Sequence, residues 1–204
     1  MASCRESPMF FIEDAEADVA RLKQLQADDP IAWQDALNTS RALVEAVKEN
    51  DVDELRRVVA NADEGELIQA LHLVCELVDR ENFSNSWRIL KTLKEGNAFG
   101  AIDINTPRSS DGWTPLCIAC ADACLPLAFK LLELNADPNV ITRSNDTPLS
   151  LAKRGQPEDN EEQREARGII SNMLRSYGAQ DSYKDVLRIS RKQSTAGKTR
   201  WKAE

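Results

Sequence analysis

One stretch decides the fold of this 204-residue chain: Asp111-Gly112-Trp113-Thr114-Pro115-Leu116-Cys117-Ile118-Ala119-Cys120. Its centre, Thr114-Pro115-Leu116, recurs 33 residues later as Thr147-Pro148-Leu149. A fixed period of about 20–50 residues is typical of repeat proteins, in which each unit buries its apolar face against its neighbours. The recurrence therefore predicts a stack of similar units.

The residue types in this stretch fit a turn followed by a helix. Asp111-Gly112 suits a tight turn, because glycine tolerates positive φ. Thr114 can cap a helix with its hydroxyl group, and Pro115 fits the first helical position, where its missing amide costs little. The small side chains of Ala119 and Cys120 allow neighbouring helices to pack closely. A single such unit cannot bury its apolar face, so further units are expected on both sides.

Continued by Leu131-Leu132-Glu133-Leu134-Asn135-Ala136-Asp137-Pro138-Asn139, the stretch resembles the ankyrin repeat, with its DG turn, TPLHxAA helix, LLLxxGAD segment and closing Asn. The resemblance implies an all-α ankyrin-repeat solenoid, built from helix-turn-helix repeats with short β-turn fingers. We place an ankyrin domain at 39–180, with repeats at about 39–63, 64–105, 111–143 and 144–180. In the first repeat, Asn50 stands where the consensus has Gly. The second repeat is stretched and ends at Asp103-Ile104-Asn105.

Two segments depart from the repeat pattern. In the N-terminal extension, residues 1–38, Ala15, Val19 and Leu22 recur at helical spacing, and Asp29-Pro30 is typical of the start of a short helix. We expect these helices to cap the stack, since a terminal repeat otherwise exposes apolar surface. In the fourth repeat, about ten extra residues that include 157–162 are expected to loop out between its two helices.

The charge is unevenly distributed. The chain has a net charge of −8, yet the C-terminal tail, residues 181–204, carries seven Lys or Arg and three acidic residues. An acidic body argues against general nucleic-acid binding, which depends on basic residues, so we expect at most a weak contribution from the tail. The sequence shows no membrane span or secretory signal, and five cysteines are an odd number. We therefore expect a cytoplasmic protein, with the nucleus or cytoskeleton as alternatives.

The sequence offers no catalytic constellation. It has one histidine and lacks a Gly-rich phosphate loop, a GxSxG elbow and an HExxH motif, so we expect neither an enzyme nor a cofactor. His72-x2-Cys75 and Cys117-x2-Cys120 share their spacing with zinc sites. These four residues also occupy packing positions of the repeat, so we expect buried thiols, no bound metal, and a histidine that bonds the backbone of a turn.

Ankyrin proteins bind partners through their fingers and inner helices, the concave face of the stack. Carried onto this sequence, the resemblance implies partner-binding residues at Ser110, Asp111, Trp113, Ala121, Asp122, Arg143, Ser144, Asp146 and Arg154. Trp113 stands out, because a large rigid aromatic side chain often dominates an interface. A second contact through the tail would use Arg188, Arg191, Lys192, Lys198, Arg200, Trp201 and Lys202.

These features predict a protein-binding module that acts as an adaptor or scaffold, is monomeric by itself, and binds one or more proteins. Two alternatives remain open. The chain could be a structural subunit of a cytoskeletal or ciliary assembly, anchored by its basic tail. It could also be a stoichiometric inhibitor that masks an enzyme or a transcription factor.

Overall fold

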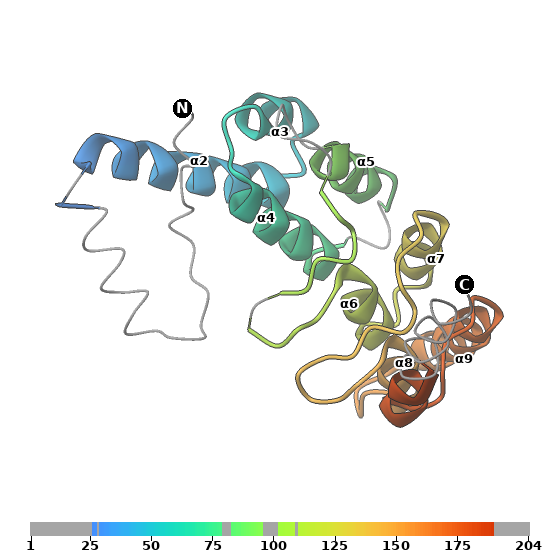
Figure 1. Cartoon of the computed structure of the whole chain (residues 1–204). Helices are drawn as coiled ribbons and strands as arrows, with labels where there is room; N and C mark the ends of the chain where they lie inside the picture. Colours follow the sequence, from blue (N-terminus) through green and yellow to red (C-terminus); the bar gives the residue numbers. More distant parts are fainter. Residues whose placement is uncertain (1–25, 28, 79–82, 96–101, 109, 190–204) are drawn as a thin grey trace, which may run out of the picture. The chain divides into compact units, whose positions relative to one another are not determined.

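The computed structural model describes residues 26–27, 29–78, 83–95, 102–108 and 110–189 (Figure 1). These residues form helices and turns and contain no strand. The chain divides into two compact units, residues 1–118 and 119–204. The principal helices are α2 (Pro30–Lys48), α3 (Val52–Val59), α4 (Glu64–Glu76), α5 (Phe83–Glu95), α6 (Pro115–Ala121), α7 (Leu125–Glu133), α8 (Pro148–Arg154) and α9 (Glu161–Ser176).

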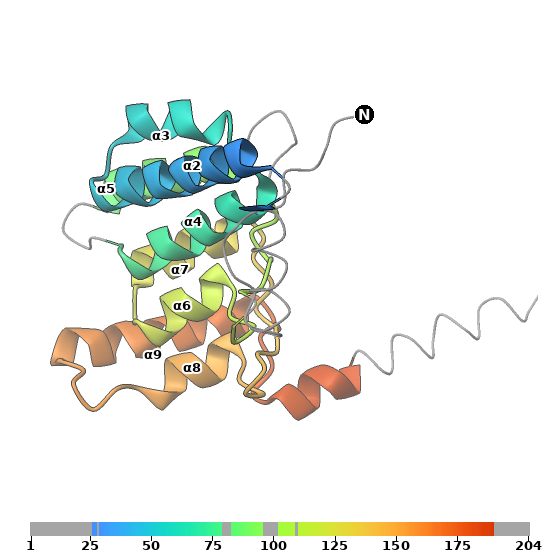
Figure 2. The same ribbon diagram turned by 90° about the vertical axis from the view of Figure 1, so that its left-hand side faces the viewer.

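The N-terminal unit contains two helical hairpins stacked in register. Helix α2 pairs with α3 and α4 pairs with α5, while α2 also packs on α4 and α3 on α5 (Figures 1 and 2). The first helices of the hairpins thus form one layer and the second helices another. Their shared core consists of fully buried aliphatic side chains: Leu43, Leu55, Leu71, Ile89, Leu90 and Leu93. This two-layer stacking of hairpins is the ankyrin arrangement.

The first helix is longer than the sequence suggested. We expected a short capping helix from Pro30, but α2 continues for 19 residues through the position at which we placed the start of the first repeat. No Gly or Pro interrupts residues 31–48, so nothing ends the helix earlier. The buried Ser40 hydroxyl on α2 donates to Glu66 Oε1 on α4 at 2.5 Å. Ala15, Val19 and Leu22 lie outside the described residues.

The C-terminal unit shows part of the same packing. Helix α8 pairs with α9, and α7 packs on α9, as α3 does on α5. The core again consists of buried aliphatic side chains: Leu127, Leu131, Leu132, Leu149, Ile170 and Leu174. Asn139, which closes the third repeat, donates to the Gly178 carbonyl (3.2 Å) and accepts from the Gln180 amide (2.9 Å). These two hydrogen bonds therefore join the end of the third repeat to the end of the fourth.

Helix ends use asparagine where the ankyrin consensus has glycine. Asn50, between α2 and α3, has φ 57°, and Asn135, after α7, has φ 64°. Gly178 takes the corresponding place after α9, with φ 86°. Asparagine tolerates the left-handed region better than other non-glycine residues. The expectation that Asn50 replaces a glycine is confirmed.

The insertion in the fourth repeat is mostly helix, which corrects our expectation of a loop through residue 162. The turn covers only 155–160, and Glu161 and Glu162 form the first turn of α9, which has 16 residues against nine in α7. Asn160 starts this helix early, because it caps the Gln163 amide while the Gln163 side chain accepts from the Asn160 amide. The extra residues thus lengthen the outer helix.

Candidate protein-binding surfaces

The first finger, residues 108–113, is a tight turn in the N-terminal unit. The Arg108 amide donates to the Trp113 carbonyl at 2.7 Å, and the Gly112 amide donates to the Arg108 carbonyl at 2.8 Å. Gly112 has φ 73°, as expected for the Asp-Gly pair. Ser110 is exposed, whereas Asp111 and Trp113 are half-buried. The finger therefore presents part of the tryptophan side chain on a backbone closed by hydrogen bonds.

Sequence reasoning missed Arg108, which braces this finger. Its guanidinium donates to both Asp111 carboxylate oxygens, at 3.2 and 2.6 Å, and forms an ion pair with Glu76 on α4. Burial raises the pKa of Asp111, but hydrogen bonds from Arg108 and from the Trp113 amide outweigh this, so its pKa is lowered overall. The Arg-x-x-Asp spacing across a turn was the available signal. Asp111, which the sequence suggested only as a partner contact, therefore also stabilises the conformation of the finger.

The single histidine lies beneath the first finger. His72 is buried, and its Nδ1 donates to the Ile68 carbonyl of the same helix at 2.8 Å. This differs from our expectation of a bond to a turn, because the carbonyl one helical turn earlier is within reach. Burial lowers the pKa of His72, and the Ile68 and Trp113 carbonyl groups offset this only in part. His72 is therefore a neutral core residue at pH 7.

The second finger, residues 142–146, lies in the C-terminal unit. The Thr142 amide donates to the Asp146 carbonyl at 2.9 Å, and the Asp146 amide donates to Thr142 Oγ1 at 3.0 Å. Asn145 provides the left-handed residue, with φ 60°. Arg143 and Ser144 are exposed at the tip. Backbone bonds thus fix this finger as they fix the first.

Asp146 plays a different part from the one we assigned to it. Its side chain is only 12% exposed, and it forms an ion pair with Arg154 at the end of α8. The Ser150 hydroxyl also donates to it, at 3.4 Å. Asp146 therefore positions Arg154, whose side chain remains 60% exposed. Arg154 offers the outward-facing group of this pair.

The remaining predicted contacts differ in their exposure. Asp122, after α6, is exposed, whereas Ala121 is buried. Arg188 is exposed near the end of a short helix, residues 183–189. The other tail contacts, Arg191, Lys192, Lys198, Arg200, Trp201 and Lys202, lie outside the described residues.

The proposed packing role of the cysteines agrees with their burial. Cys75, Cys117, Cys120 and Cys124 are all buried, with at most 3% of their surface exposed. Among the described residues, no group of three or more His, Cys, Asp or Glu side chains is arranged to hold a metal ion.

Within the same residues, no helix has the length and apolar character needed to cross a bilayer.

The hairpin stacking and the finger turns define an ankyrin-repeat protein, and the comparisons agree. The ankyrin-repeat family model matches residues 111–143, the repeat nearest to consensus. Ankyrin repeats are protein–protein interaction modules.

Similar curated proteins combine these repeats with a second domain. The BTB/POZ domain and ankyrin repeat-containing protein NBCL of Lupinus angustifolius is 34% identical over 117 residues, 55% of this chain and 21% of that protein. NPR5 of rice, Oryza sativa subsp. japonica, is 37% identical over 84 residues, 41% and 15% of the two chains. The Arabidopsis thaliana relative, Regulatory protein NPR5, is 33% identical over 117 residues, again 55% and 21%. The chain spans about a fifth or less of the length of these relatives.

Proposed function

We propose that the chain is a protein-binding adaptor or scaffold that engages its partner through its two fingers. The observation that carries this proposal is the way each finger is built. Backbone hydrogen bonds close both turns, and in each an aspartate is held by an arginine, Asp111 by Arg108 and Asp146 by Arg154. A surface fixed before binding loses little conformational freedom when a partner docks.

Each finger offers a different kind of contact. On the first, Ser110 and the half-buried Trp113 supply a hydroxyl group and an aromatic face. On the second, Arg143 supplies an exposed cation, and Arg154 at the end of α8 supplies another beside Asp146. Aromatic and arginine side chains are enriched among the residues that dominate binding energy. Asp122 adds an exposed carboxylate after α6. The basic tail, with Arg188 at its start, serves as a second contact to an acidic partner surface.

A regulatory role is the second candidate, and the name of one relative favours it. The Arabidopsis thaliana relative is called a regulatory protein. A chain that masks its partner in a stoichiometric complex would use the same finger residues. The two candidates differ in stoichiometry, because an adaptor holds two partners at once and an inhibitor holds one.

The test is quantitative affinity capture with the tagged full-length chain and its Trp113→Ala variant. We expect to capture a protein whose binding free energy weakens by more than about 2 kcal/mol when the indole is removed, which is a loss of affinity of roughly thirtyfold. Phe129→Ala is the matched control, because Phe129 is a 43% exposed aromatic residue on α7, outside both fingers. Circular dichroism must show that each variant is folded. Equal capture by the wild-type chain and a folded Trp113→Ala variant would contradict the proposal.

A further inference from the structure

One nitrogen of the single histidine is buried without a hydrogen-bond partner. His72 on α4 is only 3% exposed, and its Nδ1 lies 2.8 Å from the Ile68 carbonyl oxygen. Because a carbonyl oxygen only accepts, Nδ1 carries the proton, and Nε2 of the neutral imidazole is left as an acceptor. No group in the described part of the chain donates to this Nε2 atom. Buried polar atoms without a partner are rare in folded proteins, so this one calls for an explanation.

The first finger, residues 108–113, covers this imidazole. The Trp113 carbonyl group acts on His72, and it also accepts the Arg108 amide in the 2.7 Å hydrogen bond that closes the finger. Helices α2 and α5 pack on α4 as well, and the core of these helices consists of fully buried aliphatic side chains. The finger is only half-buried or exposed. Opening the finger is therefore the least costly way to bring water to the imidazole.

The charges that act on His72 belong to the Arg108 brace of the same finger. Arg108 disfavours a proton on the imidazole and Glu76 favours one, and these two residues form an ion pair with each other. Arg108 also donates to Asp111, and the lowered pKa of Asp111 keeps its carboxylate charged at mildly acidic pH. A proton on His72 would therefore place a second cation beside Arg108 and attract Glu76, one helical turn further along α4.

The elements packed on α4 carry their other charges away from the finger. On α4 itself, Asp63 and Glu66 form the capping box at the start of the helix, next to Glu64. Helix α6, which follows the finger, contains no charged residue. The charged side chains of α2 and α5 are exposed or half-buried: Asp35, Arg41, Glu45, Lys48, Arg88, Lys91, Lys94 and Glu95.

The open and closed forms of the finger differ in their affinity for a proton. Burial, helped by the charge of Arg108, lowers the pKa of His72 while the finger is closed, and the carbonyl groups of Ile68 and Trp113 offset this only in part. In an open finger water reaches the imidazole, and its pKa returns toward the ordinary value of about 6.5. The closed form thus keeps its full stability above about pH 6.5 and loses it as the pH falls, until the closed form also takes up the proton.

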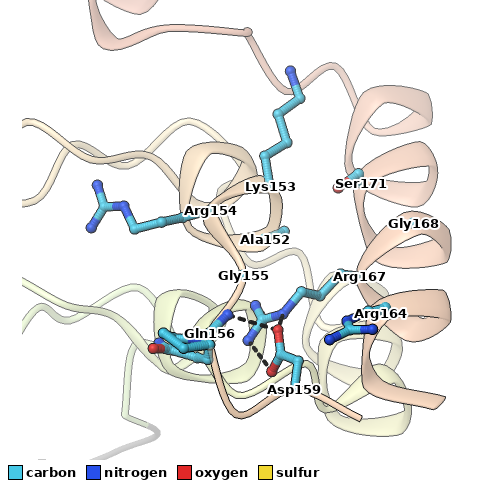
Figure 3. A pocket seen from close by; sticks show the side chains of 11 residues that line it. Ala152, Lys153, Arg154, Gly155, Gln156, Asp159, Arg164, Arg167, Gly168 and Ser171 are labelled. Atoms are coloured by element: carbon cyan, nitrogen blue, oxygen red, sulfur yellow. Dashed lines mark hydrogen bonds and ion pairs between the residues drawn. The ribbon is translucent and has the colours of Figure 1, made fainter. Parts of the chain in front are cut away.

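We propose that His72 is a pH-sensitive switch for the first finger: the neutral imidazole lies under the closed turn, and its protonation favours an open turn while α4 stays folded. The second finger lacks such a residue, because the chain has one histidine. Its aspartate, Asp146, pairs with Arg154, which extends from the end of α8 away from the turn 155–160 (Figure 3). The second finger should therefore stay closed in mild acid.

The switch adds regulation to the surface described above. Acid would weaken a partner contact made through the first finger, and this consequence rests on the proposed function. The opening of the finger does not rest on it, because it is a property of the chain alone and can be measured without a partner.

The test is amide hydrogen exchange of the full-length chain, resolved by NMR at pH 7.0 and 5.5, with each rate divided by its intrinsic rate at that pH. The resulting open fraction at the Arg108 and Gly112 amides, both bonded within the first finger, should rise in acid. One proton with an ordinary pKa in the open form allows a rise of up to about eightfold. The Thr142 amide of the second finger and the amides inside α4 are internal controls and should change less than about twofold. His72→Gln, which stays neutral, should abolish the rise.

A second measurement needs no variant. Because the chain has one histidine, its imidazole ¹⁵N signals need no assignment. We expect the Nδ1–H tautomer at pH 7 and a titration midpoint below about 6.5. The Nε2–H tautomer, or a midpoint at or above that value, would overturn the proposal.

Three exchange results would also overturn it. The first is the same acid-dependent opening at Arg108 and Gly112 in the wild-type chain and in a folded His72→Gln variant. The second is an equal rise at Thr142, and the third is an equal rise inside α4, which would indicate unfolding of the helices. Failure of the proposed function is a separate result: Trp113→Ala would leave capture unchanged, whereas exchange in the chain alone would still follow the predicted pattern.

Discussion

Arg167→Met should destabilise the C-terminal unit strongly, because Arg167 connects three parts of that unit. Its guanidinium forms four hydrogen bonds, two to Asp159 in the α8–α9 turn and one each to the carbonyl groups of Cys120 and Ala121. The side chains of Arg167 and Asp159 are only 8% and 4% exposed. The methionine fills much of the same space but donates to none of these acceptors.

The expected loss follows from the groups left behind. Removing one partner of a buried ion pair typically costs about 3–5 kcal/mol, because the other charge stays buried without compensation. We expect about 3 kcal/mol, the lower end, since the turn 155–160 can open and let water reach the carboxylate. Urea denaturation followed by circular dichroism measures this loss. Asp159→Leu in the Arg167→Met background should restore part of it, because no buried carboxylate then remains.

Arg164→Met is the matched control, one turn earlier on the same helix. Arg164 is 63% exposed, and its 3.7 Å ion pair lies at the surface, so its replacement should cost less than about 0.5 kcal/mol. The reasoning is refuted if Arg167→Met loses no more stability than this control, or if the Asp159→Leu replacement destabilises the Arg167→Met variant further.

Three further predictions follow from burial and backbone geometry. The pKa of His72 is lowered in the folded state, so on acidification the unfolded chain takes up a proton at this residue before the folded chain does. The free energy of unfolding should therefore fall below about pH 6.5, by at most about 1.4 kcal/mol per pH unit. Urea midpoints measured across pH 5–7 check this, and in His72→Gln the pH dependence that comes from this residue should disappear. Leu131→Ala, at a position with 0% exposure, should cost about 2–5 kcal/mol in the same assay, and Phe129→Ala, 43% exposed, far less. Gly168→Ala should raise the free energy of unfolding by about 0.5–1 kcal/mol, because the added methyl group meets open space; a loss of stability would show that the helix needs its glycine.

The repeat architecture could be predicted because its signals are local. The Thr-Pro-Leu recurrence set the period, Pro115 and Pro148 begin α6 and α8 as expected, and Asn50 adopts the positive φ expected from its place in the repeat. Each of these depends on a few consecutive residues whose backbone preferences are strong. Helix lengths were harder, since α2 and α9 extend beyond the boundaries that the repeat pattern suggested.

The long-range contacts of Arg167 and Arg108 could not be predicted, because they join residues far apart in the chain. Arg167 reaches carbonyl groups more than 45 residues earlier, and Arg108 reaches Glu76 across 32 residues. Periodicity carries no information on such pairs. The insertion that includes 157–162 was expected to loop out, yet Asp159 within it is buried against Arg167. A run of charged residues predicts a solvent-exposed segment, but it does not reveal that one acid within the run, Asp159, is buried.

The central claim is that each of the two fingers contacts a partner protein, and hydrogen–deuterium exchange on the captured complex tests it most directly. The measurement compares amide exchange in the full-length chain alone and with its captured partner. We predict added protection at residues 108–113 and 142–146, and little change in α3, α5, α7 and α9. Protection confined to α3, α5, α7 and α9, with both fingers exchanging as they do in the chain alone, would contradict the claim that the fingers contact the partner.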